Sequence, residues 1–413
     1  MNIEKIIIKK GNNNVLTKEE LNYAFNGYLK GLISDLEMTR LLKAICKNSM
    51  NIDEISNLTD IFINSGKILD LSDISGVKVD KHSTGGVGDK TTFIIGAIAA
   101  ACGVKVPKMS GRSLGHTGGT IDKLESVPNV KSSLTILEFI KQVKEIGFAI
   151  TSQTDDLVPL DKVIYALRDV TGTVESIPLI ASSIMSKKIA SGADKILIDI
   201  KYGDGALIKT KDLAKELSEI MINIGKRYDK EVRTIYSDMS YPLGYAIGNN
   251  LEIFEVLSIL KNDKLFFKDV NQNLRNLCIE LATNMVSMGL NISIEDAKEK
   301  VLTVLNNKEA LNKFYKVIKY QNGDLKLLKN NYIPISIISK TNGTLKGIKT
   351  KKIGQLLTML GGGRITKDDI IDYEAGIVLN KNLNDNIKVG DVLAYIYTKR
   401  RISLDINDLF III

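Results

Sequence analysis

The chain has 413 residues, of which 44% are hydrophobic and 25% charged, and its formal net charge is +8. These proportions are ordinary for folded proteins, and they exclude disordered, collagen-like and disulfide-scaffold classes. With 6% aromatic residues and no tryptophan, the chain also lacks the stacking side chains typical of single-stranded nucleic-acid binders. The excess of lysine permits an anionic ligand, but it selects none because the lysines are spread along the chain.

Residues 17–64 predict helices, because apolar side chains recur there at three- and four-residue spacing. From about residue 71, short β-type runs alternate with glycine-rich loops and helices, which predicts a mainly parallel α/β sheet that binds ligands at the carboxyl ends of its strands. Residues 161–192 return to a helical pattern. After residue 334 the chain is β-rich with turn pairs such as NG and GG.

We therefore expect an α/β protein with an all-helical domain and a larger domain built on a parallel sheet. The helical domain is expected at residues 1–66, with 160–192 packing into it. The α/β domain is expected at 70–155 and 193–330, and a β-rich C-terminal subdomain at 331–413.

The segment KHSTGGVGDKTT, residues 81–92, follows a predicted strand and opens a predicted helix. Its glycines allow backbone N–H groups to approach an oxyanion, and the helix N-terminus adds partial positive charge. Lys81, Ser83 and Thr92 add side-chain donors. The segment does not match a Walker A loop, because Asp89 stands where that pattern requires glycine before the lysine.

A second glycine-rich loop, SGRSLGHTGGTIDKLE, follows the next strand and offers Ser110 and Thr120 as donors. Asp122 and Glu125 have the spacing of a capping box for the following helix. Because the two loops carry hydroxyls and a lysine but few carboxylates, they favour a site for free phosphate over one for a magnesium nucleotide.

Further along the chain, four side chains share one face of a predicted helix, at spacings of three, four and seven residues. They are Ile180, Ser183, Ile184 and Lys187. Tyr165 and Arg168 share a second face, which could bring an aromatic wall and a cation to one ligand. The alternative is that Lys187 only covers apolar surface with its long stem.

The two glycine-rich segments closely resemble those of the thymidine/pyrimidine-nucleoside phosphorylases, and the resemblance continues through YALRDVTGTVES, ASSIMSKKIASGAD and PLGYAIGNNLEIFE. It implies phosphorolysis: inorganic phosphate attacks the anomeric carbon of thymidine, deoxyuridine or uridine and releases the base and an α-D-(deoxy)ribose 1-phosphate. It also implies a homodimer, a phosphate site in the α/β domain, a base site in the helical domain, and domain closure during catalysis.

The resemblance carries site residues over to this chain. The phosphate site comprises Lys81, Ser83, Thr92, Lys108, Met109, Ser110 and Thr120. The base site comprises Leu114, Tyr165, Arg168, Ile180, Ser183 and Lys187. Arg168 and Lys187 would stabilise the negative charge of the leaving base, and His82 would be its general acid. His116, the only other histidine, is expected to shape its loop.

Some members of this family hold a monovalent cation, often potassium, near the first loop. Its ligands carry over to Gly88, position 90, Leu243, Ala246 and Glu255, but position 90 is usually small and here it is Lys90. Two interpretations are open. Lys90 places its own ammonium there and pairs with Glu255, or it points to solvent and leaves the cation in place. No other cofactor is expected.

Two other functions remain possible from the sequence, besides a phosphorylase restricted to thymidine. An anthranilate-type phosphoribosyltransferase would need carboxylates for a magnesium-bound diphosphate near the first loop, where only Asp89 is available. A basic nucleic-acid-binding protein is disfavoured by the scattered charge. Three isolated cysteines without a C-x-x-C pair favour a reducing cytoplasm over a zinc site or disulfides, and the longest apolar run is too short for a membrane span.

Overall fold

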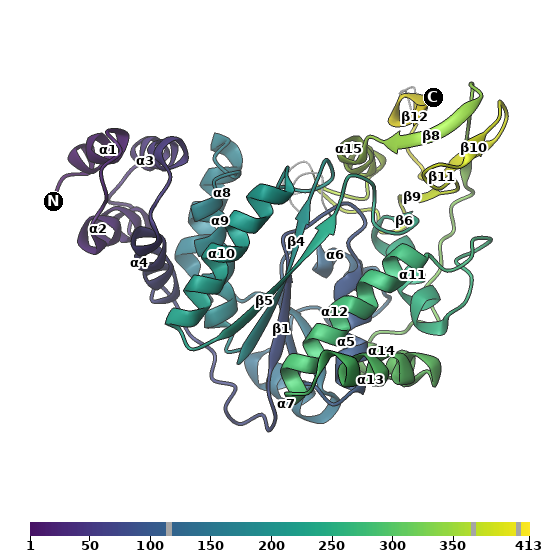
Figure 1. The fold of residues 1–413 in the computed structure, drawn as a ribbon, viewed down its shortest axis with the longest axis horizontal. Helices are drawn as coiled ribbons and strands as arrows, with labels where there is room; N and C mark the ends of the chain where they lie inside the picture. Colours follow the sequence, from purple (N-terminus) through teal and green to yellow (C-terminus); the bar gives the residue numbers. More distant parts are fainter. Residues whose placement is uncertain (113–117, 365–368, 402–405) are drawn as a thin grey trace. The chain divides into compact units, whose positions relative to one another are not determined.

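The computed structural model describes residues 1–112, 118–364, 369–401 and 406–413. They form two compact units (Figure 1). Unit 1 takes residues 1–73, 153–196 and 211–234, and unit 2 takes the described residues within 74–152, 197–210 and 235–413. Residues 211–234 therefore group with the helices, although we expected them in the α/β domain, and residues 331–413 share unit 2 with the sheet.

Unit 1 is a bundle of helices. They are α1 (Ile3–Gly11), α2 (Lys18–Leu29), α3 (Asp35–Asn48), α4 (Ile52–Ile63), α8 (Pro159–Thr171), α9 (Ile177–Ala190) and α10 (Lys211–Arg227). Successive helices α2, α3 and α4 each begin with a capping box, in which side chain and backbone satisfy each other's donors. The pairs are Thr17 with Glu20, Ser34 with Glu37 and Asn51 with Glu54. These caps fix the start of each helix by interactions between residues that are close in sequence.

Helix α1 lies outside the predicted helical range. It buries Ile3, Ile6 and Ile7, and its N-terminus is capped by Asn2. An ion pair joins it to α4, because the Lys10 ammonium lies 2.8 Å from the Glu54 carboxylate and both side chains are buried. The stability of α1 therefore comes from this tertiary pair and its apolar face, since a nine-residue helix is marginal by itself.

Two sheets place the glycine-rich loops, and most of their residues belong to unit 2, although 195–196 and 231–234 belong to unit 1. Strands β1 (Val79–Ser83), β4 (Lys195–Tyr202) and β5 (Glu231–Asp238) form one sheet in the order β1-β4-β5, and β2 (Val106–Ser110) pairs in parallel with β3 (Phe148–Ser152). A parallel bridge between Lys78 and Lys105 lies just before β1 and β2. Strands β1 and β2 thus run side by side in the same direction, and their carboxyl ends meet at one edge.

The helices of unit 2 that accompany these strands pack against them and against one another. They are α5 (Thr91–Ala101), α6 (Thr120–Glu125), α7 (Ile136–Ile146), α11 (Asn249–Lys261), α12 (Gln272–Leu290), α13 (Ile294–Asn306) and α14 (Glu309–Tyr320). Helix α5 is buried almost all round and packs against α12 and α14. The Phe148 ring packs so closely on α5 that position 96 must be glycine, because a Cβ there would lie 2.3 Å from a ring carbon. Among the described residues no single helix is long and apolar enough to cross a membrane; α12 and α13, bent by 116°, meet that criterion only as a pair.

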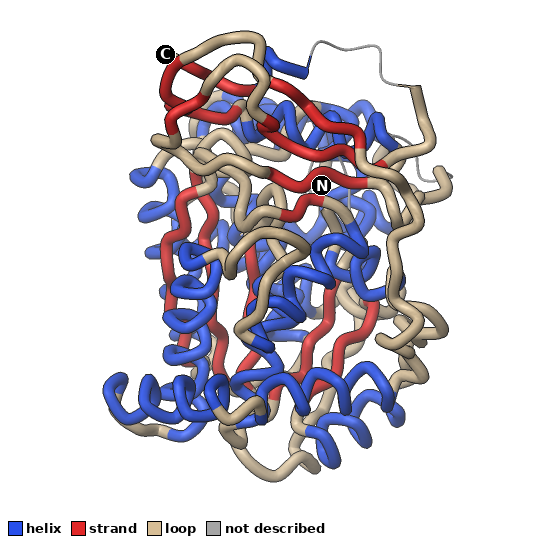
Figure 2. Tube along the Cα trace, turned by 90° about the vertical axis from the view of Figure 1, so that its right-hand side faces the viewer, coloured by secondary structure: helices blue, strands red, loops and turns tan. Residues whose placement is uncertain are grey.

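The C-terminal part of unit 2 is β-rich. Its elements are β6 (Ala246–Ile247), β7 (Ile335–Ile338), β8 (Gly343–Ile348), α15 (Thr350–Leu360), β9 (Gly376–Leu379), β10 (Asn386–Ile387), β11 (Val392–Tyr397), a 3₁₀ turn (Ile406–Leu409) and β12 (Phe410–Ile412). The sheets have the orders β6-β9-β11-β7 and β10-β8-β12. The last strand, β12, pairs with β8 (Figure 1), and in Figure 2 the C-terminus lies beside strands drawn in red. Strand β6 immediately precedes α11, so the chain connects this first sheet directly to a helix of the α/β core.

Candidate active site

The first glycine-rich loop connects β1, which ends at Ser83, to α5, which begins at Thr91. Gly85 and Gly88 have φ angles of +90° and +80°, a left-handed conformation that glycine adopts without steric cost. Thr92, in the first turn of α5, is buried. The loop therefore has the backbone form predicted for an anion-binding turn in front of a helix N-terminus.

Asp89 fixes the conformation of this loop. Its carboxylate accepts the Ser83 hydroxyl at 2.5 Å, and the Thr91 hydroxyl and backbone N–H at 2.6 and 3.2 Å. Burial raises the pKa of Asp89, but three ammonium groups and the Ser83 hydroxyl outweigh it and hold that pKa well below its usual range. These ammonium groups belong to Lys201, Lys81 and Lys123. The loop is thus clamped by an ionised carboxylate at neutral pH.

Lys81 lies beneath the loop. Its buried ammonium donates to the Thr91 hydroxyl at 2.6 Å and lies 3.1 Å from the Asp199 carboxylate. The ammonium of Lys201 is 2.8 Å from the same carboxylate, and although burial lowers the pKa of Lys201, the carboxylates raise it overall. Neighbouring His82 is half-buried on β1. Positive charge is therefore concentrated under the loop, held in place by acidic partners.

The second loop follows β2. Ser110, at the end of β2, and Thr120, at the start of α6, are half-buried and accessible in part. Lys108 and Met109 are buried, and the Lys108 ammonium donates to the backbone carbonyl of Lys81 at 2.7 Å. Lys108 thus ties β2 to β1, whereas the hydroxyls of Ser110 and Thr120 belong to residues that are only half-buried.

Two predictions for the second loop, Leu114 in the base site and His116 as a loop-shaping residue, lie outside the described residues.

The expected capping box is wrong, because α6 begins before Asp122 and both carboxylates lie inside the helix. They instead bind arginine: Arg112 pairs with Glu125 and also lies 3.4 Å from Asp122. The local spacing alone could not distinguish a cap from these ion pairs.

The predicted base-binding residues come together in unit 1. The Lys187 ammonium lies 2.8 Å from the Asp161 carboxylate and 3.0 Å from the Ser183 hydroxyl, and 5.6 Å from the centre of the Tyr165 ring. Ile180 of the same helix is buried beside them. The Lys187 side chain is 21% exposed, whereas that of Asp161 is 3% exposed. The ammonium group is therefore held by protein partners on a side chain that is not fully buried.

Arg168, also predicted for the base site, lies 6.0 Å from the centre of the Tyr165 ring and is bonded to the main chain. Its guanidinium donates to the backbone carbonyls of Thr173, Leu179 and Val174 at 3.0–3.2 Å, and the residue is only 1% exposed. Burial lowers its pKa, and Asp161 partly opposes that shift. Arg168 therefore closes the connection between α8 and α9, and at most two of its five N–H groups remain for a ligand.

Asp161 and Asp89 are the site residues that the sequence analysis missed as partners. Asp161, Tyr165 and Arg168 stand at i, i+4 and i+7 of α8, so the same helical spacing that paired Tyr165 with Arg168 could have included Asp161. Asp89 was considered only as a magnesium ligand. Its position between the glycine-rich turn and Thr91 was the only local signal for a role in the loop.

The five positions carried over for a monovalent cation also meet. Lys90 contacts Leu243, Ala246 and Glu255, and a Cβ on Gly88 would lie 2.7 Å from the Leu243 carbonyl oxygen. The side chain of Lys90 is 0% exposed. The solvent-pointing interpretation of Lys90 is therefore wrong.

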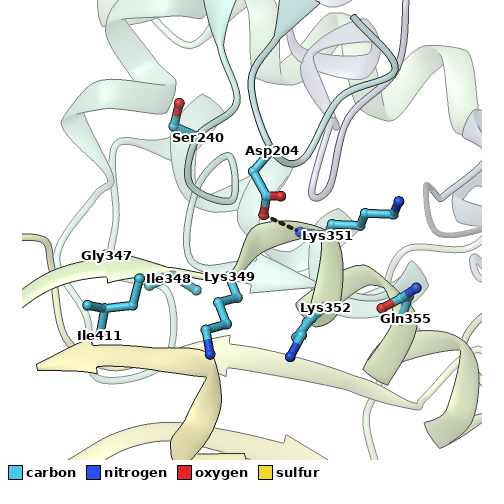
Figure 3. A pocket seen from close by; sticks show the side chains of 9 residues that line it. All are labelled: Asp204, Ser240, Gly347, Ile348, Lys349, Lys351, Lys352, Gln355 and Ile411. Carbon is cyan, nitrogen blue, oxygen red and sulfur yellow. Dashed lines mark hydrogen bonds between the residues drawn. The ribbon is translucent and has the colours of Figure 1, made fainter. Parts of the chain in front are cut away.

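A cavity of about 580 Å³ lies elsewhere in unit 2, beside the N-terminus of α15, with Lys349, Lys351 and Lys352 around it (Figure 3). The Asp204 carboxylate already accepts the Lys351 backbone N–H at 2.9 Å, so it satisfies the end of the helix that an anion would seek. Lys351 and Lys352 are exposed. We assign no ligand to this cavity.

Three family models match the chain. "Glycosyl transferase family, helical bundle domain" covers residues 4–66, "Glycosyl transferase family, a/b domain" covers 75–311, and "Pyrimidine nucleoside phosphorylase C-terminal domain" covers 344–407. Two curated relatives are called pyrimidine-nucleoside phosphorylase. The one from Geobacillus stearothermophilus is 45% identical over 97% of this chain and 93% of its own, and the one from Bacillus subtilis is 44% identical over the same shares. The chain belongs to the pyrimidine-nucleoside phosphorylase family.

For this member of the pyrimidine-nucleoside phosphorylase family the predicted fold class is confirmed: a helical domain, an α/β domain on a mainly parallel sheet, and a C-terminal domain. Among solved structures, anthranilate phosphoribosyltransferase from Thermus thermophilus matches with a TM-score of 0.59 and 15% identity. The match covers 77% of this chain and 99% of that one. At this identity the match shows a shared fold and not a shared reaction.

Proposed function

We propose that this protein catalyses the reversible phosphorolysis of pyrimidine nucleosides, with inorganic phosphate as co-substrate. A phosphate oxygen forms a bond to the anomeric carbon of the sugar while the bond from that carbon to the base nitrogen breaks. The electron pair of the broken bond leaves with the base, and the products are free base and α-D-(deoxy)ribose 1-phosphate. The observation that carries this proposal is 44–45% identity to pyrimidine-nucleoside phosphorylases across 93% of their length.

Lys187 is assigned the central role on the base side. An ammonium has three N–H donors; two are directed to Asp161 and Ser183, and the third is available for a pyrimidine carbonyl. A fixed cation at that carbonyl stabilises the negative charge that develops on the leaving base. Tyr165 offers its ring face, and Arg168 holds the α8–α9 connection while adding positive charge nearby.

The phosphate side is assigned to the two glycine-rich loops. The contact groups are Lys81, Ser83, Thr92, Lys108, Met109, Ser110 and Thr120. Of these, Ser83 must turn its hydroxyl from Asp89 toward the anion, and Lys81 acts by charge from below the loop. Because the attacking group is phosphate, no covalent enzyme intermediate is required and positioning supplies much of the catalysis. His82 is assigned the proton for the leaving base.

The test is phosphate-dependent release of base. Purified protein is incubated with phosphate and thymidine, deoxyuridine or uridine, and base and sugar phosphate are separated by chromatography. We expect equal amounts of both products from all three nucleosides, and none without phosphate. Base release from thymidine alone would restrict the specificity. Failure with every nucleoside, combined with turnover of 5-phosphoribosyl diphosphate and anthranilate, would refute the proposal.

We also infer a homodimer and a reducing compartment. The dimer follows from family resemblance and is tested by light scattering of the purified protein. The compartment is supported by three cysteines that are all unpaired, because disulfides form and persist in oxidising surroundings.

A further inference from the structure

The Lys90 ammonium is fully enclosed by oxygen atoms. It donates to the backbone carbonyl of Leu243 at 2.9 Å, to that of Ala246 at 2.8 Å and to the Glu255 carboxylate at 2.5 Å. Lys90 is 0% exposed, and Glu255 is 1% exposed. An ammonium has three donors, so each of them has an acceptor.

The acceptors are themselves held in position. Glu255 accepts the backbone N–H groups of Tyr245 at 2.8 Å and Ala246 at 2.9 Å. The backbone N–H of Leu243 donates to the Val87 carbonyl in the glycine-rich loop at 3.0 Å. The segment before α11 and the loop before α5 are thus joined by a backbone hydrogen bond and by the contacts of the Lys90 ammonium.

These residues do not fit a bound metal cation. Two carbonyls and a carboxylate are the hard oxygen ligands that a monovalent or divalent cation would use. Here the same three oxygen atoms coordinate the Lys90 ammonium, and a metal ion on them would bring a second positive charge into contact with the first. The single negative charge of Glu255 is already neutralised by the Lys90 ammonium, so no charge is left to neutralise a metal ion.

We propose that Lys90 is a built-in cation: its ammonium takes the place of a monovalent metal ion between the first glycine-rich loop and the segment before α11, so that this chain needs no such ion. Lys90 is a positioning residue, since its partners belong to the protein and not to the substrate. It fixes the residue directly before Thr91, where α5 begins and where the Asp89 clamp ends.

The decisive variant is Lys90→Thr, which removes the ammonium and leaves the three oxygen atoms open, with Lys90→Met as an uncharged partner that offers no ligand. Lys298→Thr, at an exposed lysine of α13, is the matched control. Each dialysed protein is measured in potassium, sodium or choline chloride at equal ionic strength. The measurements are the midpoint of thermal unfolding and the kcat and KM for phosphate. The kinetic measurement rests on the proposed phosphorolysis, whereas the unfolding measurement does not.

We expect the native protein and Lys298→Thr to be indifferent to the choice of cation in both measurements. Without potassium, Lys90→Thr and Lys90→Met should lose about 10- to 100-fold in kcat/KM, the usual effect of removing an outer partner of a functional group. Potassium should restore activity and raise the unfolding midpoint of Lys90→Thr, but not of Lys90→Met.

Potassium activation of the native protein would overturn the proposal, and so would a folded Lys90→Thr variant that ignores potassium in both measurements. Full activity of Lys90→Met would overturn it as well. If neither variant folds, the native protein still decides, because a potassium-dependent rise of its unfolding midpoint contradicts a site already filled by lysine. If no nucleoside is cleaved, the unfolding measurements stand and only the proposed function fails.

Discussion

Lys187, paired with Asp161, is expected to contribute both to catalysis and to the stability of the fold, and the two contributions can be measured separately. Lys187→Met removes a charge-assisted bond to the leaving base, worth roughly 1.5–3 kcal/mol, so kcat/KM for thymidine should fall about 10- to 150-fold. The same change leaves the Asp161 carboxylate, 3% exposed, without its cation. We expect a loss of about 2–3 kcal/mol of unfolding free energy, below the roughly 3–5 kcal/mol of a fully buried pair, because the lysine end is 21% exposed.

The double variant Asp161→Asn/Lys187→Met separates the two contributions. It removes the unpaired carboxylate, so unfolding in urea should recover most of the lost stability, whereas the initial rate of base release should remain as low as in Lys187→Met. Lys215→Met, at an exposed lysine of α10, is the matched control and should change neither measurement. Normal kcat/KM in Lys187→Met, or recovery of activity in the double variant, would refute the assignment of Lys187 to the base.

Three further outcomes are expected. His82→Ala should keep measurable base release and lose less than Lys187→Met, because a leaving pyrimidine can also take a proton from water; a fully inactive variant would contradict this ranking. Arg168→Lys should lower the urea midpoint, since one ammonium cannot span the three carbonyls that the guanidinium reaches; an unchanged midpoint would show that these bonds are dispensable. Asp89→Asn should be less stable than the native protein at neutral pH. Because the pKa of Asp89 is depressed in the folded state, its stabilising contribution is present above the ordinary aspartate pKa of about 3.9 and is lost as the pH falls through the folded value. The difference in unfolding free energy should therefore shrink in acid, and a constant difference would contradict the clamp.

Local patterns predicted the elements that have local causes. The reciprocal caps at Thr17, Ser34 and Asn51 are encoded within four residues, and the helical spacing of Ser183 and Lys187 needs only one turn. Each of these features could therefore be read directly from the sequence. Helix α1 also has local signals, the Asn2 cap and the spacing of its isoleucines, but a nine-residue helix is marginal by itself, and its ion pair between Lys10 and Glu54, 44 residues apart, could not be predicted from local patterns.

The site required long-range information for the same reason. The motif predicted an anion site at Lys81 and Ser83, but it could not show that the Lys81 ammonium pairs with Asp199 of another strand. Arg168 was predicted as a cation beside a base, and local spacing could not show that three of its donors bind main-chain carbonyls. The type and spacing of residues indicate which chemical groups a site can use. The partners of each group in the folded protein determine how many of its donors and charges remain for the ligand.

The contact between Lys90 and Glu255 spans 165 residues of sequence, which has a consequence for biosynthesis. The glycine-rich loop leaves the ribosome long before α11 exists, and until then the carboxylate that Lys90 contacts in the folded protein is missing. The loop therefore acquires its final form late, after the helices of the N-terminal bundle have been made. A nascent chain interrupted before Glu255 would carry both glycine motifs intact and still lack the joint that holds the first of them.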